Sequence, residues 1–232
     1  MPTPIITIDG PGGVGKGTMA RIIAGKLGFH FLDSGALYRV TAYACQKHHI
    51  PVEDPTKVAA IACALNLKFE LKDDPMMDPG VIFEDEQVNE FIRAEACGTL
   101  ASKISSYPEL RQALLSLQHS FAKEPGLVTD GRDMGTIIFP EAPAKFFLTA
   151  SPEVRAQRRQ GQLQAQGICA KIDNLLEEIK ARDLRDQTRS IAPLVPAKDA
   201  LIIDTSTLSI NDVVALMMQY IKKTGVKVPQ AL

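Results

Sequence analysis

Residues 10–18 read GPGGVGKGT, after an apolar run at residues 5–8 and before a stretch of helical pattern at residues 16–27. This stretch has the pattern of a phosphate-binding loop: a glycine, four further residues, a second glycine and a lysine. The glycines of such a loop let backbone N–H groups converge on phosphate oxygens at a helix N-terminus. Lys16 is then expected to reach the terminal phosphates of a nucleotide. The alternative is a glycine-rich turn that only joins a strand to a helix. Strand, turn, lysine and helix in this order favour the phosphate loop.

One position of this loop departs from the usual pattern. The residue after the lysine is Gly17 instead of Ser or Thr, and the hydroxyl follows at Thr18. A hydroxyl near the terminal phosphates can contact Mg²⁺ directly or through water. Thr18 is therefore the candidate metal contact of the loop. The loop residues expected to form the phosphate cradle are Gly10, Pro11, Gly12, Gly13, Val14, Gly15, Lys16, Gly17 and Thr18.

Length and composition limit the fold and the partners. The 232 residues suffice for one α/β domain with a small insertion, and 45% apolar and 23% charged residues are ordinary for a globular protein. A formal charge of −1 gives no global attraction to nucleic acid or to an anionic membrane. The sequence contains no C-x-x-C pair, no signal-peptide pattern and no apolar run of about 18 residues. We expect a cytoplasmic protein with reduced cysteines.

Short β-prone runs alternate with helical patterns along the chain, which is typical of a parallel sheet with crossover helices. The β-prone runs cover residues 5–8, 29–32, 126–129, 146–149 and 200–203. Further helical patterns cover residues 56–65, 108–123 and 171–190, and another helix is expected to start near Pro152.

Four of the five runs are followed directly by an aspartate, at Asp9, Asp33, Asp130 and Asp204. Open α/β sheets place ligand sites at the carboxyl ends of their strands, so these carboxylates are expected to face a cleft. For each one the alternative is an aspartate that caps a helix or closes a turn, and this alternative is strongest for Asp204.

Between residues 65 and 108 the pattern changes. Alternating apolar residues at Leu67, Phe69 and Leu71, a turn-rich stretch and a second apolar run indicate antiparallel strands inserted into the domain. Eight acidic residues against one lysine lie between residues 70 and 90, so this unit is not expected to bind phosphate. A solvated, acidic outer face is the simplest interpretation of the charge run.

Seven of the eleven arginines lie between residues 132 and 189. Arg155, Arg158 and Arg159 are spaced i, i+3 and i+4, which places them on one face of a helix. Three guanidinium groups on one side repel one another unless an anion joins them, so this face is expected to bind an anion.

The helical pattern at residues 171–190 carries a second group of charges. Its apolar stripe, at Ile172, Leu175, Leu176 and Ile179, continues with the same period into Arg182, Asp186 and Arg189. A solvated face normally lies opposite the apolar stripe, so this arrangement favours residues that line a cleft. The alternative is a set of surface ion pairs along the helix.

Phosphoryl transfer accounts for a phosphate loop together with many arginines. The moving group carries charge spread over its oxygens and needs no protein nucleophile, so catalysis consists of positioning and positive charge. A guanine-reading N-K-x-D sequence, which a switch GTPase would need, is absent from the 232 residues. The sequence therefore favours a kinase.

Five segments resemble the bacterial cytidylate kinases, within the P-loop nucleoside monophosphate kinases. They are GPGGVGKGT, LDSGALYR at residues 32–39, YPELR at 107–111, DGRDMGT at 130–136 and RDLRDQTRSIAPL at 182–194. The segments occur in the order of that family, and the resemblance covers residues 6–220. The loop by itself indicates only the superfamily.

The resemblance implies a three-layer α/β P-loop fold with five parallel core strands. The chain would form one domain over residues 1–232, with a core at about 1–60, 106–150 and 190–224. An antiparallel unit on the acceptor side would span about 64–105 and a helical lid about 152–188. The implied activity is transfer of the γ-phosphoryl group of ATP to CMP or dCMP with Mg²⁺. The implied protein is a monomer without nucleic-acid or membrane partners.

The family's functional positions can be carried over to this sequence. The resemblance implies that the phosphate loop and Arg155, Arg158 and Arg159 bind ATP. It implies that the CMP site comprises Ser34, Tyr38, Arg39, Ser102, Arg111, Arg132, Asp133, Arg182 and Asp186. The implied catalytic residues are Lys16, Arg132, Arg182 and Arg189.

The chemistry of cytosine agrees with these base-reading positions. A carboxylate at Asp133 attracts the N4 amino donor of cytosine and opposes the O4 acceptor of uracil, and Arg111 can donate to the O2 and N3 acceptors. An alternative for Asp133 is an ion pair with its neighbour Arg132, and Tyr38 could pack beneath the pocket without touching the nucleotide. Two other functions stay open: a kinase of the same superfamily acting on a small-molecule hydroxyl, and a nucleotide-sensing module without transfer activity.

Overall fold

Five parallel strands form the central sheet of the computed structural model, which describes residues 3–70, 72–165 and 167–227. In sheet order they are β2 (His30–Asp33), β6 (Leu127–Gly131), β1 (Ile5–Asp9), β7 (Ala144–Thr149) and β8 (Leu201–Asp204). The neighbouring strands are parallel, which confirms the predicted sheet. Asp33 lies opposite Asp130 and Asp9 lies opposite Gly131, so the carboxyl ends of the three strands meet at one edge.

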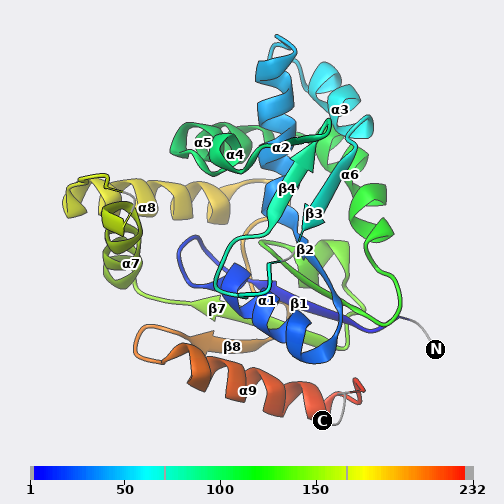
Figure 1. Cartoon of the computed structure of the whole chain (residues 1–232), viewed down its shortest axis with the longest axis vertical. Helices are drawn as coiled ribbons and strands as arrows, with labels where there is room; N and C mark the ends of the chain where they lie inside the picture. Colours follow the sequence, from blue (N-terminus) through cyan, green and yellow to red (C-terminus); the bar gives the residue numbers. More distant parts are fainter. Residues whose placement is uncertain (1–2, 71, 166, 228–232) are drawn as a thin grey trace.

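Helices cover both faces of this sheet and make it the middle of three layers, as Figure 1 shows. One face carries α1 (Lys16–Leu27) and α9 (Ile210–Lys223), whose buried side chains pack with Ile6 and Ile8. The other face carries α2 (Ser34–Lys47), α3 (Pro55–Cys63) and α6 (Pro108–Ser120). Successive side chains of a strand point to opposite faces, so Thr7 and Asp9 point to the side opposite Ile6 and Ile8.

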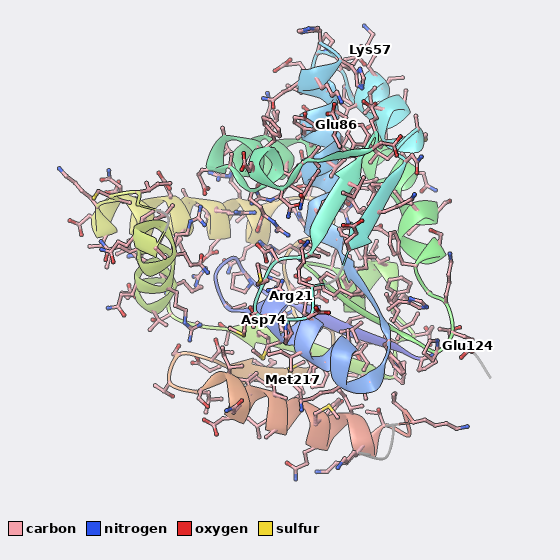
Figure 2. The ribbon with its side chains drawn as sticks, viewed as in Figure 1. Arg21, Lys57, Asp74, Glu86, Glu124 and Met217 are labelled. Carbon is pink, nitrogen blue, oxygen red and sulfur yellow. The ribbon has the colours of Figure 1, made fainter. Side chains whose placement is uncertain are left out.

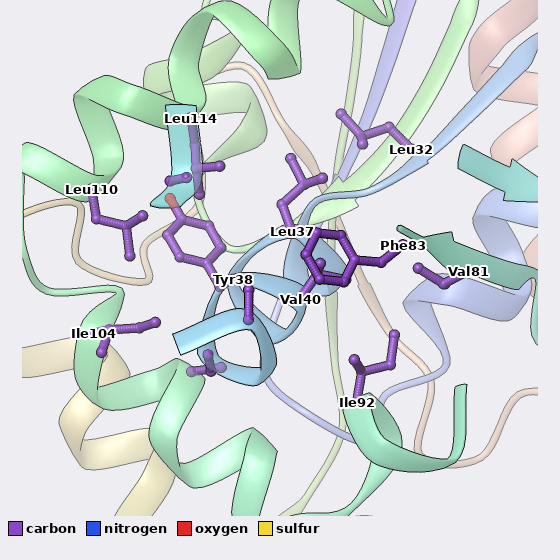
Figure 3. Close-up of a cluster of buried hydrophobic side chains, with 14 of the residues drawn as sticks. Leu32, Leu37, Tyr38, Val40, Val81, Phe83, Ile92, Ile104, Leu110 and Leu114 are labelled. Atoms are coloured by element: carbon purple, nitrogen blue, oxygen red, sulfur yellow. The ribbon is translucent and has the colours of Figure 1, made fainter. Parts of the chain in front are cut away.

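The antiparallel unit predicted between the helical patterns is confirmed as a three-stranded sheet followed by two helices. Its elements are β3 (Leu67–Glu70), β4 (Gly80–Phe83), β5 (Glu86–Gln87), α4 (Asn89–Arg93) and α5 (Glu95–Ile104), and we call them the insert. Leu71, which the pattern placed in the first strand, lies outside the described residues. Val81 and Phe83 pack into the same buried cluster as Leu37 and Val40 of α2 (Figure 3). The insert therefore shares its hydrophobic core with the central domain.

A pair of helices, α7 (Pro152–Ala165) and α8 (Ile172–Thr188), projects from the carboxyl side of the sheet (Figure 1). The two helices pack on each other, and Leu175 is the most deeply buried apolar residue of α8. Asp186, about three turns farther along and on the stripe predicted from the sequence, is also buried. The predicted change of this stripe from apolar to polar is therefore present in the folded chain.

The acidic charge run of the insert is more than a solvated face. Figure 2 labels Arg21 of α1 and Asp74 of the insert loop. Arg21 is only 8% exposed, and its guanidinium donates to Pro75 O at 2.8 Å and lies 3.1 Å from the carboxylate of Asp78. Asp78 also lies 3.5 Å from Nε of Arg93, which in turn pairs with Asp33 at 3.1 Å. The predicted solvated acidic face is confirmed, because all eight acidic residues are exposed. In addition, an arginine of the phosphate-loop helix holds this loop against the core.

Removing the charge of Asp78 is expected to loosen this loop without unfolding the protein. Half of the Asp78 side chain is exposed, so the Asp78→Asn change should cost at most about 1 kcal/mol of global stability. Local opening of the loop depends on few contacts, so its frequency should increase more than that of global unfolding. Hydrogen exchange of residues 72–80 measures this increase. Asp85→Asn, at the β4–β5 turn, is the matched control. Equal exchange in the two variants would mean that the Arg21 contact does not hold the loop.

Candidate active site

A cleft of about 1530 Å³ lies at the carboxyl end of the central sheet. The phosphate loop, the α7–α8 pair, α5 and the ends of β2 and β6 supply its walls. A pocket for one small ligand is typically about 300–1,000 Å³, so this cleft has room for two. A second hollow of about 620 Å³ lies between α3 and α6, and its described lining contains neither lysine nor arginine. We therefore place the phosphate chemistry in the first cleft.

The phosphate loop has the backbone that its glycines predict. Gly10, Gly13 and Gly15 have φ values of 146°, 80° and 90°, a region that L side chains rarely adopt. A side chain at Gly10 would also overlap the carbonyl of Leu148 in β7. Helix α1 begins at Lys16, so its unpaired N–H groups and the positive end of its dipole lie at the loop. Residues 12–18 line the cleft, where phosphate oxygens can reach these groups.

Lys16 is buried, and its Nζ donates to Pro11 O of the same loop at 2.8 Å. Burial lowers the pKa of Lys16 to about 7, and the nearby cations Arg132 and Arg182 lower it further while Asp130 opposes the shift. A buried amine beside other cations gains most from an added anion, because the anion favours the charged form. Lys16 is thus poised to bind phosphate.

Binding of metal-free ATP at pH 8 is expected to take up protons. Lys16 is then largely neutral in the empty protein, since its pKa of about 7 lies below the pH of the solution. The phosphates raise the pKa of Lys16, and also that of Asp130, so both groups bind protons. Titration calorimetry in two buffers of different ionisation enthalpy measures the uptake, and Lys16→Met should remove most of it. Proton release, or equal uptake by the variant, would argue against contact between Lys16 and phosphate.

The four strand-end aspartates have different roles. Asp33 accepts the backbone N–H of Ala36 at 2.9 Å and so caps α2, and Asp204 accepts the N–H of Ser206 in an exposed turn. Asp9 accepts the N–H groups of Met134 and Gly135. The capping alternative is therefore correct for Asp9 and Asp33, and the turn alternative for Asp204. Asp33 also lines the cleft, as predicted.

Asp130 is the exception. One of its carboxylate oxygens is buried without a hydrogen-bond partner within the described chain, and Asp130 lines the cleft. Burial and the neighbouring Asp33 raise the pKa of Asp130 to about 7, and Lys16 lowers it. Sequence reasoning assigned Asp130 to the cleft edge but not to the site. The signal that could have identified Asp130 was its position at the end of a strand expected beside the one that leads into the phosphate loop.

Hard oxygen donors for Mg²⁺ are present on this side of the cleft, at Thr18 and Asp130. Within the described ranges, no group of three or more His, Cys, Asp or Glu side chains is arranged to hold a metal ion. Mg²⁺ commonly keeps several waters and takes only one or two protein ligands together with substrate phosphates. The residues present therefore fit a magnesium ion that arrives with a nucleotide.

Four arginines, from α2, α8 with its C-cap residue, and the segment after β6, converge in the cleft. Arg39 of α2 donates to Ile92 O at 2.6 Å, and Arg132, which follows β6, pairs with Asp186 of α8 at 3.0 Å. Within the described chain, Nε of Arg182 is buried without a hydrogen-bond partner, as is one terminal nitrogen of Arg189. Burial lowers the pKa of Arg182 to about 10, and its neighbour Arg132 adds to the effect. Buried donors of this kind call for an anionic partner.

The two predicted base-reading residues pair with each other. Arg111 of α6 forms an ion pair with Asp133, and its guanidinium lies 5.9 Å from the ring centre of Tyr38. The alternative ion pair between Asp133 and its neighbour Arg132 is wrong, because Arg132 turns toward Asp186 on α8. Arg111 and Asp133 are both largely buried, so the pair forms a fixed polar wall of the cleft.

The remaining acceptor-side residues also lie at this end of the cleft. Tyr38 is only 8% exposed, packs in the core cluster and still lines the cleft beneath Arg111. Ser34 is buried, and its hydroxyl accepts a hydrogen bond from Gln118 at 3.0 Å. Ser102 is half-buried on α5 and also lines the cleft. The fold thus brings the predicted acceptor residues together around Arg132 and Asp133.

The three arginines of α7 line the cleft but do not share an anion in this conformation. Arg155 pairs with Asp183 of α8 and donates to Gly12 O of the phosphate loop at 3.2 Å. Each of the other two has its own partner: Arg158 donates to Thr205, and Arg159 pairs with Glu95 of the insert at 3.2 Å. In this conformation the fold supplies each guanidinium group with its own acceptor, and binding of a common anion stays a prediction.

Comparison with known proteins agrees with this geometry. Residues 6–223 match the family described as cytidylate kinase. A cytidylate kinase from Shewanella piezotolerans is 49% identical over 221 residues, which are 95% of this chain and 96% of that protein. One from Colwellia psychrerythraea is 50% identical over 218 residues, which are 94% of this chain and 96% of that protein.

Among solved structures, an uncharacterized protein from Eubacterium ventriosum aligns with a TM-score of 0.52 at 13% identity. The alignment covers 95% of this chain and 99% of that chain. At that identity the likeness concerns the fold alone. No helix of the described residues is both long and apolar enough to cross a membrane.

Proposed function

The chain belongs to the cytidylate kinase family, and we propose that it transfers the γ-phosphoryl group of ATP to CMP and dCMP, giving ADP and CDP or dCDP. The observation that carries the proposal is the set of buried, partly unsatisfied arginine donors that faces the phosphate loop across one cleft. One anion on each side of that cleft satisfies both sets of donors. A phosphate donor and a phosphate acceptor are therefore the natural pair of ligands.

On the donor side, the loop N–H groups and Lys16 bind the β- and γ-phosphates of ATP. Lys16 leaves the carbonyl of Pro11 and keeps its positive charge against the γ-phosphate, where negative charge develops during transfer. Thr18 and Asp130 would hold Mg²⁺, which neutralises charge on the phosphate oxygens when bound. The protein supplies no covalent intermediate in this account, because phosphoryl transfer needs alignment and positive charge.

On the acceptor side, Arg39 and Arg132 clamp the phosphate of CMP, and Arg182 lies between the two phosphates. Arg189 adds charge to this side of the cleft from the end of α8. Asp186 is expected to contact the sugar while it orients Arg132. Cytosine lies between Ser102 and the Arg111–Asp133 pair, with Tyr38 beneath and Ser34 lining the pocket. Uracil would present its O4 acceptor to the Asp133 carboxylate, and two acceptors that face each other are costly in a buried site.

We assign the role of a lid to the α7–α8 pair. Arg155, Arg158 and Arg159 would exchange their present protein acceptors for ATP phosphates as the pair closes. Closure excludes water, and without it the γ-phosphoryl group would be lost to hydrolysis. We also propose that the protein acts as a monomer, because one chain supplies the whole proposed site.

Transfer can be followed directly with ATP labelled at the γ-phosphate. The expected product with CMP is CDP that carries the label on its terminal phosphate, together with unlabelled ADP. Labelled inorganic phosphate without labelled CDP would contradict the proposal. CMP should also raise the thermal unfolding midpoint. Protection by a sugar or another small hydroxyl compound, and not by any nucleoside monophosphate, would instead favour the small-molecule kinase.

A further inference from the structure

Two aspartates lie next to the start of the short π-helical turn η1 (Met134–Ile138). One of them caps the turn, and the other forms an ion pair in the cleft. Asp133 occupies the residue before the turn, yet its side chain makes no cap hydrogen bond and pairs with Arg111 instead. Asp9 of β1 accepts the N–H of Met134 at 2.9 Å and the N–H of Gly135 at 2.8 Å. The cap of this turn therefore comes from a different strand.

This division is unusual for the residue type. Aspartate is among the most favoured residues before a helical turn because its own carboxylate accepts the first free N–H groups. Here those N–H groups are already satisfied by Asp9, so the Asp133 carboxylate is free to face the cleft. π-helical turns are rare and often occur at functional sites. The cap from β1 thus determines where the proposed base reader points.

The turn lies directly on β1, with no space between them. A side chain at Gly135 would place its first carbon 2.7 Å from Oγ1 of Thr7 and 3.4 Å from the Asp9 carboxylate. A β-carbon at Gly135 would therefore overlap Thr7, while it would only contact the Asp9 carboxylate. Thr7 and Asp9 point to this side because strand side chains alternate. The position of η1 is consequently fixed by the strand that leads into the phosphate loop.

The Asp9 carboxylate lies near charged residues of both halves of the cleft, Lys16 and Asp133. Burial raises the pKa of Asp9 to about 6; the nearby Asp133 raises it further, while the two N–H donors and Lys16 lower it. A buried carboxylate is costly, and a turn could be capped by a neutral side chain at lower cost. Stability alone therefore does not explain an aspartate at this position.

We propose that Asp9 is a positioning residue of the acceptor site, which holds Arg132 and Asp133 in register with the phosphate loop that begins at Gly10. The proposal rests on the role in cytosine recognition proposed for Asp133. It makes the donor loop and the acceptor-reading segment one rigid unit, because one residue connects them through two hydrogen bonds. A displacement of about 1 Å at a reacting geometry can cost about 10²-fold in rate.

The Asp9→Asn variant tests this proposal, since its amide can accept only one of the two N–H groups and presents NH₂ to the other. We expect kcat/KM for CMP and the preference for CMP over UMP each to fall about tenfold or more. The KM for ATP should stay close to wild type, and the thermal unfolding midpoint should fall by a few degrees, because one buried N–H loses its acceptor. Asp54→Asn is the matched control, because Asp54 caps α3 through the N–H of Lys57 and lies outside the cleft.

A second variant covers the case in which Asp9→Asn does not fold. Gly135→Ala moves η1 off β1 while it leaves the Asp9 side chain in place, and it should lower the CMP preference in the same way. An unchanged CMP preference in the folded variant, or a loss confined to the KM for ATP, would overturn the positioning role. A wild-type protein that does not prefer CMP overturns the proposed function as well. If the wild type prefers CMP, and Asp133→Asn abolishes this preference while Asp9→Asn leaves it intact, only the positioning role is overturned.

Discussion

Replacing Lys16 by Met is expected to lower kcat by about 10²–10³-fold, the typical effect of removing one preorganised donor from a transition state. The Lys16 ammonium is buried at the start of α1, where it faces the growing charge of the transferred group. Met has a similar length and an apolar stem, so the core packing around the loop should survive. CMP binding depends on the opposite side of the cleft and should change less than twofold in calorimetry.

Lys26→Met is the matched control for this substitution. Lys26 lies on the same helix, in its last turn, and its side chain is exposed to solvent. Turnover of the control should equal that of the wild type. A normal kcat for Lys16→Met would contradict the assignment of residues 10–18 as the site that binds the transferred phosphate. Loss of CMP binding together with turnover would show a general disruption of the cleft instead of a defect in transfer.

The second large effect concerns Asp133, whose carboxylate is expected to pair with the N4 amino group of cytosine. Asp133→Asn should reduce the preference for CMP over UMP by about 1–3 kcal/mol, the discrimination of one good bidentate base contact. The amide can donate to O4 of uracil, so the rate with UMP should rise relative to CMP. The ratio of the two kcat/KM values measures this effect and is independent of the fraction of folded enzyme.

Asp199→Asn provides the control for a lost carboxylate outside the cleft. Asp199 pairs with the buried Lys145 at 2.8 Å, beyond the residues that line the cleft. This variant should keep the wild-type ratio of CMP to UMP. If Asp133→Asn also kept that ratio, Asp133 would serve only as the ion-pair partner of Arg111.

Much of the fold could be predicted because its signals are local. The β-prone runs, the glycines of the phosphate loop and the start of α1 each depend on residues close in the sequence. Positive φ values at Gly13 and Gly15 follow from the loop pattern itself. The stripe of α8 could be continued from Leu175 to Asp186 because a helix repeats every 3.6 residues.

The partners of the charged residues could not be predicted in the same way, because they depend on which elements meet in space. Arg111 was expected to read a base, and it also pairs with Asp133 from a different element. Arg155 meets Asp183 only because α7 packs on α8. Arg21 had no predicted role until the fold brought the insert loop to α1.

The strand-end aspartates illustrate the same limit. All four were expected to face the cleft, since each follows an apolar run, although a turn was favoured more strongly for Asp204. Their roles separate only when the neighbouring backbone is known, because a carboxylate beside free N–H groups becomes a cap. Asp130 has no such neighbour within the described residues and keeps a free oxygen in the cleft. Tertiary contacts thus decide which of four similar residues is available for chemistry.

The central claim is that one cleft holds ATP on the phosphate-loop side and a cytosine nucleotide on the arginine side. The most direct measurement is the rate of ADP formation with six acceptors in turn: CMP, dCMP, UMP, TMP, AMP and GMP. The account predicts the highest kcat/KM for CMP and dCMP and much lower values for AMP and GMP. If AMP were the best acceptor, the assignment of Arg111 and Asp133 to cytosine recognition would be contradicted.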